Sequence, residues 1–143
     1  MSIVILDLGS EQGPHVSAIV RHDVHEFTAL INGSKADLAD LIGKECIVEM
    51  LFETVASWKE LHEFQDDQSC IMASAATPGA TTLQGRVHNI SELGENSHII
   101  DLYLQNGPEF LALSSAELNG AVPALRSALE VTVHGLCFYP TGA

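Results

Sequence analysis

Short apolar runs rich in β-branched residues, each closed by turn residues, dominate this chain and limit what it can fold into. The first run covers residues 3–8 and stops at a turn of Gly, Ser, Glu and Pro, and further runs cover 15–22 and 25–31. Runs of this length and composition suit a pleated sheet. The sequence therefore predicts a mostly β protein with short helices.

The order of these elements recurs in the second half of the chain. Residues 15–30 align without a gap on residues 98–113, and the matched pairs include Phe27 with Phe110 and Ala29 with Ala112. In each half a short helix signal (34–42 and 123–128) precedes a long apolar strand (45–55 and 129–139). We expect two units related by internal duplication, residues 1–75 and 76–143, packed as one compact chain or even a single domain, with both phenylalanines in the core.

Each unit reads strand, strand, strand, helix, strand. In element order this resembles the oligonucleotide/oligosaccharide-binding (OB) barrel, which closes with a fifth strand. The resemblance implies two OB-like β-barrel units. Residues 69–73 are expected to provide the fifth strand of the first unit, whereas the second unit is expected to borrow one. The pair Asn106-Gly107 predicts the hairpin turn between two strands of the second unit.

The charge and cysteine content narrow the classes of partner. Lys and Arg number 6 against 19 Asp and Glu, a formal charge of −13, which repels phosphate and makes nucleic acid an unfavoured partner. No apolar run is long enough for a membrane span, and no basic-flanked leader is evident. Three separated cysteines without a C-x-x-C pair indicate a reduced, cytoplasmic protein, and no cofactor is expected.

Histidines form the densest set of candidate metal ligands. His22 and His25 flank Asp23-Val24, and His15 lies one strand length earlier. In an extended strand His22 and His25 point to opposite faces, whereas a tight turn at Asp23-Val24 brings them together. This cluster supports an alternative function as a small-ligand binder or metal-dependent enzyme. Because no nucleophile–base motif accompanies it, an enzyme is the less favoured class.

Aromatic residues point to a different function. Phe138 and Tyr139 belong to the most aromatic stretch of the chain, and Trp58 is its single tryptophan. Such side chains are enriched at interface hot spots, and an exposed strand can also pair with a second copy. The favoured prediction is a non-catalytic protein-interaction or adaptor module, with a protein partner or a homodimer. A third interpretation is a single-stranded nucleic-acid-binding OB protein.

Overall fold

The computed structural model describes residues 1–65, 70–104 and 110–141 and confirms a mostly β chain with short helices. The turn predicted at Asn106-Gly107 lies outside the described residues. The elements in chain order are β1 (Ser2–Gln12), β2 (His15–His22), β3 (His25–Asn32), α1 (Lys35–Ala39), β4 (Glu45–Leu51), β5 (Thr54–Leu61), β6 (Cys70–Ala73), β7 (Thr81–Gly94), β8 (Ser97–Tyr103), β9 (Phe110–Ser114), the 3-10 helix η2 (Ala116–Leu118), β10 (Ala128–His134) and β11 (Cys137–Pro140).

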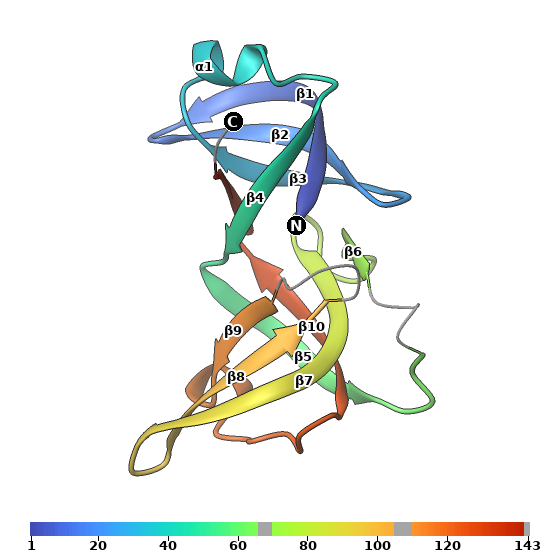
Figure 1. Ribbon diagram of the computed structural model, residues 1–143, viewed down its shortest axis with the longest axis vertical. Helices are drawn as coiled ribbons and strands as arrows, with labels where there is room; N and C mark the ends of the chain where they lie inside the picture. The colour runs from blue at the N-terminus through green and yellow to red at the C-terminus, as the bar shows by residue number, and fades with distance from the viewer. Residues whose placement is uncertain (66–69, 105–109, 142–143) are drawn as a thin grey trace.

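Five strands form a closed barrel in the order β1-β2-β3-β11-β4, with β4 returning to β1. All neighbours are antiparallel except β3 and β11, which are parallel. The helix α1 connects β3 to β4 and begins at Ser34, whose hydroxyl accepts a hydrogen bond of 3.1 Å from the Asp37 N–H. The predicted β-barrel is therefore present, but its last strand comes from the far end of the described chain (Figure 1).

The remaining strands form a second sheet in the order β5-β10-β7-β8-β9, with β6 paired to β7. This sheet is not a closed barrel, which corrects the expectation of two barrels: among the described strands β5 pairs with β10 alone and β9 with β8 alone. The fifth strand expected at 69–73 is also wrong. The described part of that segment, β6, pairs with β7 in the second sheet, while β11 completes the barrel.

Both long strands predicted from the sequence, 45–55 and 129–139, break in the middle. The first divides into β4 and β5 and the second into β10 and β11, so that each passes from one sheet to the other (Figure 1). At the crossing the Glu53 N–H donates to the His134 carbonyl at 3.0 Å, and Gly135 takes a φ of +70°. Periodicity predicts such strands but does not show where a backbone bends.

The helix expected at 123–128 is absent. The structure instead has η2, which buries Leu118. Arg126 takes a left-handed φ of +71°, and its N–H donates to the Val87 carbonyl on β7 at 2.8 Å. This stretch therefore docks on the sheet with a backbone conformation that a helix cannot contain.

The ungapped match of 15–30 with 98–113 places matched residues on opposite faces of their strands. Phe27 is buried at 4% exposure, whereas Phe110 is 47% exposed; likewise Ala29 faces the core and Ala112 faces solvent. A slip of one residue turns every side chain to the other face of a strand. The prediction that Phe110 belongs to the core is therefore wrong, even though Phe27 and Phe110 both lie on the third strand of their half.

One hydrophobic cluster runs through both the barrel and the second sheet. It includes Ile5 and Phe138 inside the barrel and Leu113 and Leu129 inside the sheet, all essentially inaccessible to solvent. β6 also packs against β3 of the barrel. The two sheets are thus joined by shared packing as well as by the crossing strands.

The crossing predicts an unusual sensitivity at Gly135. A Cβ on this residue would lie 2.5 Å from Glu53 Cγ and 2.9 Å from Glu53 Cβ, while Gly79, with φ +81°, has open space around it. We expect Gly135→Ala to lower the free energy of unfolding by about 2–4 kcal/mol, because left-handed strain and overpacking add. Gly79→Ala should cost only about 1–2 kcal/mol, from the strain alone. Urea denaturation measures both, and equal losses would contradict a tight crossing.

Candidate binding groove

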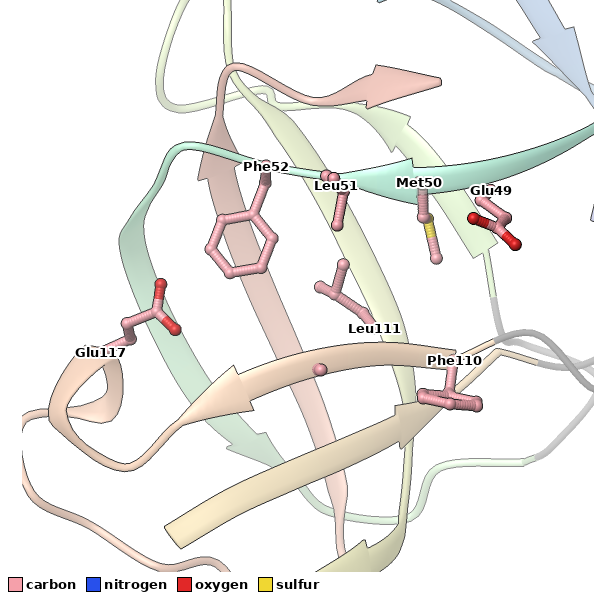
Figure 2. Close-up of a pocket in the computed structure, with 8 residues that line it drawn as sticks. Glu49, Met50, Leu51, Phe52, Phe110, Leu111 and Glu117 are labelled. Carbon is pink, nitrogen blue, oxygen red and sulfur yellow. The ribbon is translucent and has the colours of Figure 1, made fainter. Parts of the chain in front are cut away.

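An open groove lies between the barrel and the second sheet. Its volume is about 470 Å³, and its walls come from the end of β4, from β9 and from η2. Figure 2 shows β4 and β9 on opposite sides of it, with Leu51 and Leu111 pointing toward one another. The lining residues are Glu49, Met50, Leu51, Phe52, Phe110, Leu111, Ala112 and Glu117.

The β9 side of the groove is an open strand edge. The Ser115 N–H donates to the His98 carbonyl on the β8 strand at 2.9 Å, while the neighbouring Ser114 N–H turns away from β8 and donates to Glu117 Oε1 at 2.9 Å. Hydrogen-bonding direction alternates along an antiparallel strand. The N–H and C=O of Ala112 therefore point away from β8, and no other described strand pairs with them.

The β4 side has the same character. The Thr141 N–H donates to the Ile47 carbonyl at 3.0 Å on the β11 side, whereas the Val48 N–H donates to the Met1 carbonyl at 2.9 Å on the opposite side. By the same alternation the N–H and C=O of Met50 point away from β11. Pairing with β1 reaches only as far as Ile47, so no described strand covers Met50 there. Two open backbone edges thus flank the groove.

The groove combines apolar walls with acidic ends. Leu51 is 60% exposed, a large fraction for an aliphatic side chain in a strand, and lies beside the half-exposed Phe52. Figure 2 shows Glu49 and Glu117 at the two ends. Neither carboxylate forms an ion pair with a described cationic side chain, although Glu117 Oε1 also accepts from the Ser114 hydroxyl at 3.0 Å.

Three rings form a ladder across the outer face of the second sheet and end at the groove. His88 stacks on Tyr103 with ring centroids 3.9 Å apart, and Tyr103 lies parallel to Phe110 at 6.0 Å. His88 lies in the bulge within β7, Tyr103 lies on β8 and Phe110 lies on β9. Stacking fixes the orientation of Phe110, whose ring then forms part of the groove wall.

The candidate metal ligands do not gather in one place. His22 and His25 lie opposite one another across the β2–β3 turn, where Asp23 takes a φ of +56°. His22 Nδ1 lies 3.1 Å from the Ser2 carbonyl. His15 lies at the other end of β2, where Nε2 is 3.4 Å from the Tyr139 hydroxyl. The described residues contain no group of three or more His, Cys, Asp or Glu able to hold a metal.

The candidate contact residues lie away from the groove. Phe138 is fully buried in the barrel beside Phe27, with ring centroids 6.2 Å apart, so its side chain cannot meet a partner. Tyr139 is half-buried and contacts His15 edge-on. Trp58 packs against the core, and its Nε1–H donates to Asn119 Oδ1 at 3.3 Å. That contact fastens β5 to the segment after η2, where the second sheet is not closed.

The cysteines have the ionisation expected of structural thiols. Burial raises the pKa of Cys46, of Cys70 and of Cys137, and the carboxylate of Glu130 raises that of Cys70 further. A catalytic cysteine needs the opposite shift, because the thiolate is the nucleophile. A raised pKa favours the neutral thiol, which is the form in which a free cysteine packs as a small hydrophobe.

Sequence reasoning missed the groove because its residues resemble core residues. In the alternating pattern of β4, Cys46, Val48 and Met50 face inward while Ile47 and Leu51 are exposed. The sequence signal for the groove is the exposed pair Ile47 and Leu51, because these are large aliphatic residues on solvent-facing positions of a strand. On an antiparallel sheet those positions are usually polar.

No known protein family, curated protein or solved structure matches this chain. Among the residues that the structure describes, no helix has both the length and the apolar character that crossing a bilayer requires. The groove and its two strand edges are therefore the basis for assigning a function.

The positions of Phe138 and Tyr139 predict that the two neighbours respond differently to substitution. Phe138→Ala should lower the free energy of unfolding by about 3–5 kcal/mol, because it empties the centre of the barrel. Tyr139→Phe removes a long hydroxyl contact with His15 and an interaction of the same hydroxyl with Cys137. That substitution should cost at most about 1 kcal/mol. Thermal and urea unfolding measure both. A mild effect of Phe138→Ala would contradict its role in closing the barrel.

Proposed function

We propose that this chain is a non-catalytic protein-interaction module that binds an extended segment of a partner protein in the groove between β4 and β9. The observation that carries the proposal is the open edge of β9, whose Ala112 N–H and C=O face an apolar groove. A segment added there gains main-chain hydrogen bonds from the edge and side-chain contacts from the groove walls. The three free cysteines support a reducing, cytoplasmic setting.

The two-sided geometry favours a strand over other occupants. Met50 on one wall and Ala112 on the other each turn backbone donors and acceptors away from their own sheet. A strand lying between them would offer hydrogen-bond partners to both edges. Exposed Leu51 and Phe110 would be covered at the same time, and burial of apolar area stabilises such a complex by about 25 cal/mol per Å² before ordering costs.

Other classes of ligand fit the groove less well. The carboxylates of Glu49 and Glu117 and the charge of −13 repel a phosphate backbone. The histidine pair His22–His25 lies on the barrel hairpin and outside the groove lining. A protein segment is therefore the occupant that this surface favours over a nucleic acid or a metal-bound substrate.

We also propose that the two sheets are OB-type units related by duplication, which have exchanged their fifth strands. The barrel order β1-β2-β3-β11-β4 corresponds to β7-β8-β9-β5-β10 in the second sheet, where β9 and β5 are the neighbours that do not pair in the described part of the chain, and a helical turn follows the third strand of each. The registers of the exchanged strands also correspond. Leu51 pairs with Cys137 in the barrel, and His134 pairs with Thr54 in the second sheet. His134 lies 83 residues after Leu51, and Thr54 lies 83 residues before Cys137. An experimental structure in which these two strand sets fail to superimpose would contradict this proposal.

Ala112→Pro tests the proposed function directly. Proline removes the N–H that faces the groove and leaves the bonds to β8 intact, because those come from alternate residues. The matched control is Ala112→Val, which keeps the N–H and suits a strand. A phage-displayed library of random dodecapeptides is selected on the unaltered protein. Peptides it enriches should bind Ala112→Val at wild-type strength and Ala112→Pro at least about tenfold more weakly, as lost strand hydrogen bonds require.

Two results would overturn the proposal. One is the absence of enriched peptides, or equal binding of enriched peptides to Ala112→Pro. The other is a homodimer in sedimentation velocity that becomes monomeric in Ala112→Pro, because β9 would then pair with a second copy and not with a partner segment. Circular dichroism of the two variants verifies that both retain the β fold.

A further inference from the structure

We infer that the segment bound in this groove is one in which basic and apolar residues alternate, so that lysine or arginine lies on the solvent face of the added strand. The inference rests on the proposed function and specifies the chemistry of its partner. It follows from three features of the groove: which side chains face inward, which face outward, and the charge around them.

The inward side of the groove accepts apolar side chains. A strand paired to β9 alternates its side chains between the two faces of the sheet. Those that share the inner face meet Leu111 and, from the opposite wall, Leu51 and Phe52. No lysine or arginine is among the lining residues, and a charged side chain placed between these three would lose its hydration.

The outward side favours cations. Residues of the added strand that lie opposite Phe110 and Ala112 share the outer face of the sheet. Asp101 pairs with Ala112 and lies on that face, and Phe110 presents an exposed ring held by the stack with Tyr103. A lysine or arginine there can approach the carboxylate and also the face of an aromatic ring. Glutamate or aspartate would gain neither contact.

The ends of the groove add to the same preference. Glu49 and Glu117 stand at opposite ends, and neither forms an ion pair with a described cationic side chain. The chain as a whole carries −13. Charge complementarity of this kind increases the association rate and excludes acidic partners. A basic segment is thus both attracted to the groove and retained at its rim.

Three capped, fluorescein-labelled nonapeptides test the inference: alternating lysine and valine, alternating serine and valine, and alternating glutamate and valine. Fluorescence anisotropy measures their binding to the full chain at low ionic strength. The lysine peptide should bind at least about tenfold more tightly than the serine peptide, and the glutamate peptide more weakly than either. The advantage of the lysine peptide over the serine peptide should shrink in roughly 0.5 M NaCl, where charges are screened within a few ångströms.

A matched pair of double variants separates the groove from the overall charge. Glu49→Gln/Glu117→Gln keeps side-chain size and leaves an acceptor for Ser114, and it should weaken lysine-peptide binding about three- to tenfold. Glu26→Gln/Glu95→Gln removes the same charge from residues outside the groove lining and should change binding less than about twofold. Equal effects of the two variants, or equal binding of the lysine and glutamate peptides, would overturn the inference.

The outcomes also distinguish this inference from the function on which it rests. If library-selected peptides require the Ala112 N–H but show no excess of lysine or arginine, the strand-binding function stands and the basic preference is wrong. If the lysine peptide binds Ala112→Pro as tightly as the unaltered protein, binding does not use the β9 edge and the proposed function fails.

Discussion

The barrel closes because β11 lies between β3 and β4, and the rest of the molecule depends on that insertion. Phe138 fills the barrel centre from a strand that is distant in sequence from every other barrel strand. The entropy cost of closing so long a loop grows only slowly with its length, so the packing of one fully buried aromatic ring offsets much of it. The same crossing carries β5 into the second sheet, which ties the stability of the two sheets together.

The strands cross between the two sheets, and the second sheet stays open. β5 enters the second sheet from the end of β4 and pairs with β10 there. It does not pair with β9, which is the other edge of the described sheet. η2 packs against both β5 and β9 and buries Leu118, and Trp58 on β5 donates a hydrogen bond to Asn119. These contacts seal the core without pairing β9. The groove is therefore a consequence of the strand topology.

The sequence predicted much of the local structure and little of the strand pairing. The β-branched residues Ile47 and Val48, which follow the turn residue Gly43, predict a strand that the structure contains as β4. Alternation shows which face is buried but not which strand lies beside it. The breaks near Glu53 and Gly135 are not evident from the sequence, because apolar residues continue on both sides of each, and it is these breaks that send β5 and β11 to the opposite sheets.

The candidate site illustrates the same limit. Phe110 lies in an apolar run that does not show which face of the strand is buried, and the structure places it on the outer face of the second sheet beside Tyr103. An apolar open edge favours pairing with any extended chain, including a second copy. Glu49 and Glu117 oppose that outcome, because a second copy brings its own carboxylates to the same place, whereas a basic segment brings their counterions. In the proposed complex, the acidic rim would therefore favour a basic segment over a second copy of the chain.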